Sequence, residues 1–313
     1  MHARTTVTTL AAAAALLTSV ATATAATEPL SKPHVAAHFS LAASQQPENI
    51  TVDRTGSAYL TFSFARQIVR VAPAGRPQVL ATLPAPAKAS TPNLGKAFVG
   101  GIARFDDGTL YVTYATGTAD LTGVWALRPG SRPHRIATLP ADGLPNGLAL
   151  DQRTQKLYVT DSVHGVIYRL PTRGGKATVW TRGEALEPST FAGANGLKLH
   201  NGAVWATNLD KGTVLRIPVT ARGTAGRIQV HASGMPSIDD FAFTGRGDTL
   251  LAARDDNQVD LVRPDGTHIA VLTAADGLQT PTSVAVHGHT VYVPSAAYLT
   301  NEDPNLLVAH LDR

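Results

Sequence analysis

The sequence predicts an all-β protein, a six-bladed β-propeller with four-stranded blades. A short motif, in which a polar or small residue precedes an apolar strand, recurs at a spacing of roughly 45 residues, which is typical of propeller blades. Short apolar strands separated by Gly, Pro and Asp turns follow each copy, and no segment shows sustained helical periodicity. The six copies of the motif begin at Pro47, Val99, Leu144, Gly193, Ser237 and Thr280.

The third repeat shows the four strands of a blade most clearly. Its inner strand is predicted at 144–151, and three further strands follow at 156–161, 166–172 and 176–182. The same order is predicted in the other repeats. Their second strands are expected at 58–62, 110–114, 204–208, 250–254 and 291–295, their third at 68–73, 123–129, 214–219, 259–266 and 306–312, and their fourth at 77–83, 134–140, 227–233 and 267–273.

The sixth repeat reaches Arg313 after only three strands. The segment Val35–Ala43 lies before the first repeat and has no partner there. We expect it to supply the outer strand of the last blade, since that pairing closes the ring and protects its edges. The alternative is a loose leader segment.

The first residues have the pattern of a secretory signal peptide, predicted at 1–26. His2 and Arg4 precede the Ala-rich apolar run Leu10–Val20, and small-residue cleavage sites follow it. A frayed alanine helix of a cytosolic protein is the alternative. The propeller is therefore expected to span 27–313 as one domain of a secreted protein, and no other segment is apolar enough to span a membrane.

Composition excludes several classes of function. The chain has no cysteine, which excludes disulfides, thiol chemistry and thiolate metal sites. The net charge is +4 with scattered Lys and Arg, so no nucleic-acid partner is expected. A closed propeller needs no partner subunit, so we expect a monomer that binds a small-molecule substrate or ligand.

One position of the motif brings six residues toward the axis of the ring. Four of them carry oxygen donors, which suits a hard divalent cation: Ca²⁺ fits best, with Mg²⁺, Mn²⁺ or Zn²⁺ as alternatives. We call this set the axial column: Glu48, Gly100, Asn146, Asn195, Asp239 and Thr282.

The axial column also has simpler interpretations. Asn before Gly is a common turn pair, so Asn146 and Asn195 could merely begin strands. The carboxylates of Glu48 and Asp239 favour a cation, because two such groups at one axis repel each other. Neighbouring strand residues point in opposite directions, so Asp240 rather than Asp239 could face the axis.

A wider ring is expected at the ends of the second strands, with substrate-contact candidates Tyr114, Asp161, His164, Asn208 and Arg254. His164 with Asp161 could form an acid–base pair, or His164 could be an exposed loop histidine. The run 255–257 is interpreted as a solvated turn. The loops expected to shape the site are Pro84–Ala97, Thr116–Thr122, Gly183–Gly193 and Ala297–Asn305.

These repeats, with Glu, Asn, Asn and Asp heading repeats one, three, four and five, resemble the gluconolactonase / senescence marker protein / luciferin-regenerating enzyme family. The resemblance implies a propeller with a central divalent ion held by Glu48, Asn195 and Asp239, and Asn146 on the substrate side. It also implies Asp239 as general base in lactone or ester hydrolysis. The family often has Gly where this chain has Asn49 and Asp240, and Arg104 and Arg254 are candidate matches to its substrate-holding arginine.

The leading hypothesis is therefore a secreted metal-dependent lactonase. A binding propeller with a structural Ca²⁺, or a lyase or cyclase acting on a natural product, are the alternatives, since fold does not fix function.

Overall fold

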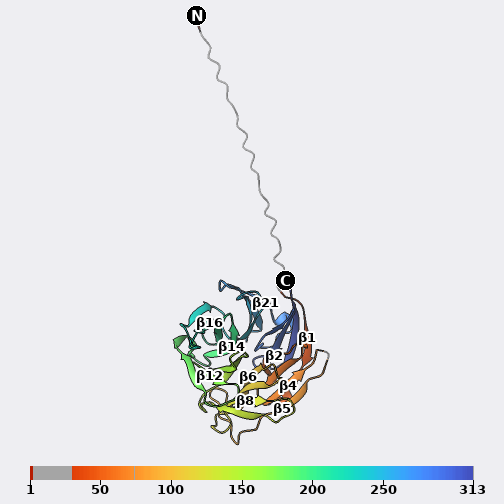
Figure 1. Ribbon diagram of the computed structural model, residues 1–313. Coiled ribbons are helices and arrows are strands. Elements are labelled where there is room, and N and C mark those ends of the chain that lie inside the picture. Colours follow the sequence, from red (N-terminus) through yellow and green to blue (C-terminus); the bar gives the residue numbers. More distant parts are fainter. Residues whose placement is uncertain (3–29, 74, 313) are drawn as a thin grey trace.

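The computed structural model describes residues 1–2, 30–73 and 75–312 as six four-stranded antiparallel sheets around a central axis (Figure 1). The sequence colours follow one another around the ring, as expected when each sheet is one repeat. Apart from its first two residues, the predicted signal peptide at 1–26 lies outside the described residues. The described part of the chain holds no helix of the length and apolarity needed to span a membrane.

Each blade is one sheet, and its strands pair in sequence order. The first blade consists of β2 (Pro47–Val52), β3 (Ala58–Phe62), β4 (Gln67–Val71) and β5 (Gln78–Thr82), and the second of β6 (Phe98–Arg104), β7 (Leu110–Ala115), β8 (Gly123–Leu127) and β9 (His134–Thr138). The third consists of β10 (Pro145–Asp151), β11 (Lys156–Asp161), β12 (Val166–Pro171) and β13 (Thr178–Arg182), and the fourth of β14 (Ala194–His200), β15 (Ala203–Asn208), β16 (Thr213–Pro218) and β17 (Gln229–Ala232). The fifth consists of β18 (Ile238–Phe243), β19 (Leu250–Arg254), β20 (Gln258–Val262) and β21 (His268–Leu272), and the last of β22 (Ala285–His287), β23 (Thr290–Ser295) and β24 (Asn305–Leu311) with β1.

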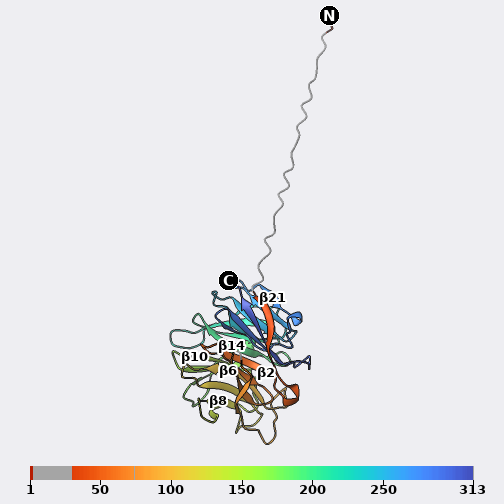
Figure 2. The ribbon, with the colours of Figure 1, turned by 90° about the vertical axis from the view of Figure 1, so that its right-hand side faces the viewer.

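The last blade takes its outer strand from the other end of the chain. β1 (Leu30–His38) pairs antiparallel with β24, from Leu30 opposite Leu311 to His38 opposite Asn305. The strand begins five residues earlier than the predicted segment Val35–Ala43, whose last three residues form the short 3₁₀ helix η1 (Leu41–Ala43). Figure 2 shows orange β1 running alongside the blue C-terminal strands.

The core lies between neighbouring blades rather than inside any one sheet. Ile68 of the first blade packs with Val99 and Val112 of the second, and Ile167 of the third packs with Val204 of the fourth. Most inner and middle strands, though not β22, are buried on both faces, so their apolar residues run nearly without interruption. This packing fixes the angle between blades and thereby the place of the strand ends at the axis.

Candidate functional site

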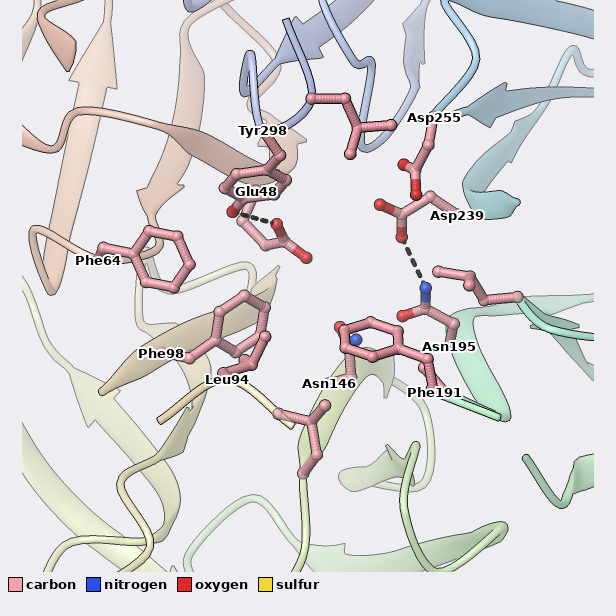
Figure 3. A pocket seen from close by; sticks show the side chains of 14 residues that line it. Glu48, Phe64, Leu94, Phe98, Asn146, Phe191, Asn195, Asp239, Asp255 and Tyr298 are labelled. Carbon is pink, nitrogen blue, oxygen red and sulfur yellow. Dashed lines mark hydrogen bonds between the residues drawn. The ribbon is translucent and has the colours of Figure 1, made fainter. Parts of the chain in front are cut away.

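A cavity of about 300 Å³ lies at the axis, where the inner strands begin (Figure 3). Four members of the axial column, Glu48, Asn146, Asn195 and Asp239, line it. The structure therefore brings together at the axis the four residues with oxygen donors that the sequence analysis placed there. The other two members have structural roles: a Cβ at Gly100 would lie 2.8 Å from Thr113, and Thr282 donates to the backbone carbonyl of Pro47.

A β-bulge at the start of each inner strand aims the axial column. In β10 the residues Asn146 and Gly147 lie opposite the single residue Thr160, and the other inner strands have one extra residue at the same place. A bulge interrupts the alternation of side chains and is common beside functional sites. It therefore re-aims the column residue at the head of each repeat, which carries a polar side chain in every repeat except the second, where it is Gly100.

A threonine from each of four second strands fixes the backbone of the next inner strand. Their hydroxyls donate to the carbonyl of the following column residue at 2.5–2.7 Å. The sequence already carried a sign of this role, since a threonine recurs at the same position in four of the second strands. The sequence prediction did not use it. The pairs are Thr61 with Gly100, Thr113 with Asn146, Thr160 with Asn195, and Thr207 with Asp239.

Asp239 and Asp240 are both buried, and they face different layers of the channel. Asp239 lines the cavity and accepts a hydrogen bond of 2.9 Å from Asn195 Nδ2. Asp240 lies one layer deeper, where it accepts from Asn49 Nδ2 and Ser283 Oγ and pairs with Lys198. The structure thus places Asp239 in the cavity, and the bulge explains why its neighbour is buried as well.

The deeper layer accounts for the two departures from the family pattern. Asn49 and Asp240 stand where glycine is frequent, and their side chains bond to each other at 2.8 Å. At the equivalent position, Gly147 and Gly196 have no room for a side chain, since a Cβ would lie 2.2 and 2.4 Å from Asn195 and Asp240 atoms. The two departures therefore form one compensating pair.

Burial governs the charge of the column. It raises the pKa of Glu48 to about 8, with further contributions from Asp255 and Asp240, against a lowering hydrogen bond from Tyr298. The pKa of Asp239 is raised well above its ordinary value, first by burial and then by the charge of Glu48. Without a cation, these carboxyls therefore favour their protonated forms.

The column residues fit a hard divalent cation. Asn195 Oδ1 is buried and has no hydrogen-bond partner in the part of the chain that the structure describes, although the Nδ2 of the same amide donates to Asp239. A buried oxygen left unpaired is costly, and a cation would satisfy it. Among the described residues, no three His, Cys, Asp or Glu side chains form a metal-binding group on their own. The candidate set is instead two carboxylates, Glu48 and Asp239, with the amides Asn146 and Asn195.

Two further polar residues reach the cavity from positions that the motif does not mark. Tyr298 donates to Glu48 Oε2 at 2.7 Å and lies 2.6 Å from Ser63 Oγ. Asp255 lines the cavity near Asp239, and burial raises its pKa to about 7, with a second contribution from Asp256 (Figure 3). The interpretation of 255–257 as a solvated turn was therefore wrong for Asp255, because the turn directs its first carboxylate inward.

The remaining lining is apolar and comes mainly from loops. Three of the four loops expected to shape the site contribute: Leu94 comes from Pro84–Ala97, Phe191 from Gly183–Gly193, and Leu299 from Ala297–Asn305. The loop Thr116–Thr122 contributes none of the lining residues. The cavity lining also contains Phe64, Phe98, Leu144, Ala192 and Leu209.

The wider ring of predicted substrate contacts has other partners and does not line this cavity. Tyr114 is buried and donates to the carbonyl of Pro84 at 2.7 Å. Asn208 donates to the carbonyls of Ala185 and Glu187 and thereby anchors a neighbouring loop. Arg254 is paired with Asp256 and Asp260.

Asp161 and His164 do meet, outside the cavity lining. Asp161 is fully buried; its Oδ1 accepts the backbone N–H of Leu144, and its Oδ2 lies 2.9 Å from His164 Nδ1. His164 is partly exposed, with Nε2 3.6 Å from Asp142. This pair orders the loop after β11, and no nucleophilic side chain is hydrogen-bonded to it in the described chain.

Solved structures with this fold include proteins described as a calcium-binding protein, a gluconolactonase and a lyase. Regucalcin from Agrobacterium tumefaciens, described as a calcium-binding protein, is 17% identical, with a TM-score of 0.64 over 86% of this chain and 92% of its own. A gluconolactonase from Xanthomonas campestris is 15% identical, with a TM-score of 0.64 over 86% of both chains. Virginiamycin B lyase from Staphylococcus aureus is 14% identical, with a TM-score of 0.60 over 90% of this chain and all of its own.

No protein-family model matches the sequence, and no curated protein matches it significantly. The likeness thus lies in the fold. The chain is a six-bladed β-propeller with the architecture shared by regucalcin, gluconolactonase and luciferin-regenerating enzyme.

Proposed function

We propose that this protein hydrolyses lactones or related small esters in the axial cavity, with a divalent cation held by Glu48, Asn146, Asn195 and Asp239. One observation carries the proposal: two carboxyls from different blades are buried at the cavity beside an amide oxygen that has no partner. Ca²⁺ suits this all-oxygen set best, and Mg²⁺, Mn²⁺ or Zn²⁺ are the alternatives.

The chain's own residues supply orientation and a proton acceptor. Asn195 Nδ2 holds Asp239 Oδ1, so Oδ2 of the same carboxylate is left to take the proton of the attacking water. Tyr298 fixes Glu48 Oε2, and Asn146 is placed to orient either the substrate or the ion. When bound, a divalent cation polarises a carbonyl and makes water more acidic.

The test is turnover of a panel of lactones by the purified protein, before and after chelation and after Ca²⁺ is added back. We expect turnover that is lost with chelator and restored by the ion. Equal rates under all conditions would contradict the metal role, and no turnover of any lactone or ester would contradict the hydrolase. Recovery of a bound ligand unchanged would favour the binding propeller. Cleavage of the ligand without addition of water would favour the lyase.

We also propose that this activity is exported, on the basis of the apolar run Leu10–Val20 and the small residues that follow it. Expression of the full chain with sequencing of the N-terminus of protein recovered from the medium tests the cleavage site. An uncleaved chain that stays with the cells would contradict export.

A further inference from the structure

We propose that the substrate is an uncharged lactone or ester with an apolar substituent, and that this substituent lies against the large apolar side chains of the cavity lining. We call this set the apolar wall; it consists of Phe64, Leu94, Phe98, Phe191 and Leu299. The reacting group in this inference rests on the proposed function, whereas recognition of the substituent follows from the cavity alone.

Among the described residues that line the cavity, none has a cationic side chain. Of these fourteen residues, five carry carboxyl or amide groups, and the others are aliphatic or aromatic, with Tyr298 the only one of these bearing a hydroxyl. Lys96 lies 5.0 Å from the centroid of the Phe64 ring but is not among the lining residues. With the proposed dication bound, the carboxylates of Glu48 and Asp239 already balance its charge, so an anionic substrate would be buried without a further cation to pair with. The cavity therefore favours a neutral molecule.

Part of the apolar lining lies opposite the carboxyls of Asp239 and Asp255, and Phe191 lies beside Asn146 and Asn195. Figure 3 shows Phe64, Phe98 and Leu94 on one side of the cavity, with Asp239, Asp255 and Asn195 opposite them. The aromatic rings support one another, since Phe64 lies 6.2 Å from Phe98 and 5.5 Å from Tyr298 between ring centroids. A ligand is therefore oriented with its carbonyl toward the column and its apolar part toward the rings.

Two residues of the apolar wall are exposed in a way that folding does not explain. Phe191 is 42% exposed and Leu299 is 69% exposed. Both residues lie in loops. The large apolar side chains that are exposed in strands each lie on the outermost strand of a blade: Val79, Val179, Val230 and Ile269. An apolar ligand would remove Phe191 and Leu299 from water, with a gain of about 25 cal/mol per Å² covered.

The loops that carry the wall are held in place without a ligand. The carboxylate of Asp210 accepts the backbone N–H groups of four consecutive residues, 189–192, at 2.6–3.1 Å. Asn93 Nδ2 donates to the carbonyl of Phe191 at 2.6 Å and so links the loop before β6 to the loop before β14. The wall is therefore preorganised, which lowers the entropy cost of binding.

The experiment compares five-membered lactones that carry methyl, propyl, pentyl or heptyl tails, with a sugar lactone as the polar reference. We expect kcat/KM to rise about fourfold for each added methylene until the wall is covered. Equal or better turnover of the sugar lactone, or no dependence on tail length, would overturn the inference while leaving the hydrolase proposal intact.

Variants at the exposed part of the wall test its role with little risk to folding. Leu299→Ser and Phe191→Ser should each reduce kcat/KM for the heptyl lactone about tenfold and leave the methyl lactone nearly unchanged. The matched control is Val230→Ser, an exposed apolar residue on β17 that does not line the cavity. An equal loss for both lactones, or the same loss in the control, would overturn the assignment of the wall.

Binding of the corresponding lactams, which resist hydrolysis, separates this inference from the proposed function. Calorimetry should show affinity that rises with tail length in the wild type and falls in Leu299→Ser. If this pattern appears but no lactone is turned over, the hydrolase proposal fails and the ligand class stands. If the lactams do not bind, or bind with no dependence on tail length, the ligand class is wrong.

Discussion

Asp239 and Asp240 are adjacent in the sequence and both buried, with 6% and 1% of their surfaces exposed, yet they have opposite surroundings. The Oδ2 atom of Asp240 is bonded to donors from three other strands or loops, Asn49, Ser283 and Lys198, while its buried Oδ1 has no partner among the described residues. Asp239 has one donor, Asn195, and otherwise lies beside the carboxyl of Asp255 and across the cavity from that of Glu48.

This difference separates a carboxylate that holds strands together from one that we propose to be functional. A buried charge that is hydrogen-bonded to its neighbours is tolerated by the fold. Removing that charge leaves the neighbouring polar groups buried without a hydrogen-bond partner. A buried carboxyl placed beside other carboxyls stores unfavourable energy that a bound cation would release. The channel thus has a deeper layer that holds the blades together and an upper layer left ready for a ligand.

The largest expected effect is on catalysis in the upper layer. Asp239→Asn should lower lactone turnover about 10²–10⁴-fold, because it removes the proposed proton acceptor and a cation ligand. Steady-state kinetics with saturating Ca²⁺ measure this. Asp265→Asn, in an exposed turn, is the matched control and should retain full turnover. Turnover by Asp239→Asn at the wild-type rate would assign the acceptor elsewhere.

The next largest effect is on folding in the deeper layer. Asp240→Ala should cost about 3 kcal/mol of unfolding free energy, because it leaves Lys198 and Asn49 without their shared acceptor. Urea denaturation measures it. Asp256→Ala, which removes an exposed partner of Arg254, should cost less than about 1 kcal/mol. Equal costs for the two variants would remove the distinction between the layers.

The pH dependence of stability should also distinguish the layers. The pKa of Glu48 is raised to about 8 by burial, and that of Asp239 is raised as well. An acid with a raised pKa in the folded state contributes stability below its unfolded pKa, and that contribution is lost as pH rises through the folded value.

The metal-free protein should therefore lose stability between about pH 5 and pH 8. Thermal denaturation with chelator measures this, and Asp239→Asn should weaken the decline. Saturating Ca²⁺ should abolish the decline, since the ion favours the charged carboxylates. A flat profile for the metal-free protein would contradict the account of stored repulsion.

The smallest effect concerns the backbone under the column. Thr207→Val should cost about 1 kcal/mol, because the carbonyl of Asp239 loses its donor and the N–H of Gly196 loses its acceptor. Chemical denaturation measures the cost. Thr213→Val, at a hydroxyl that has no partner in the described chain, is the matched control and should be nearly neutral. A control cost as large as that of Thr207→Val would remove the threonine from the account.

Sequence reasoning located the blades and the column because both repeat. A period of one blade places Glu48, Asn146, Asn195 and Asp239 at equivalent strand starts, and ring closure turns equivalence into proximity. The sequence does not decide between Asp239 and Asp240, because neighbouring strand residues point in opposite directions and a change of register by one residue exchanges them. In the structure, the bulge at the start of β18 sets this register.

The apolar wall could not be predicted residue by residue. Leu94, Phe191 and Leu299 lie in loops of different length, so no repeat relates them, and only the loops themselves were expected near the site. Tyr298 and Asp255 also lie in turns that no repeat relates, so their positions at the cavity could not be predicted either. The wider ring, including Tyr114 and Asn208, was predicted only from equivalent positions in the repeats. Such positions do not reveal that these side chains donate their hydrogen bonds to backbone carbonyls.

The central claim is that a dication binds the upper layer of the channel and leaves the deeper layer unaffected. Titration calorimetry of the chelator-treated protein with Ca²⁺ tests it most directly. The account predicts one site in the wild type, no binding by Asp239→Asn, and binding retained by Ser283→Ala, which alters only the surroundings of Asp240. Absence of binding to the folded wild type, or unchanged binding by Asp239→Asn, would contradict it.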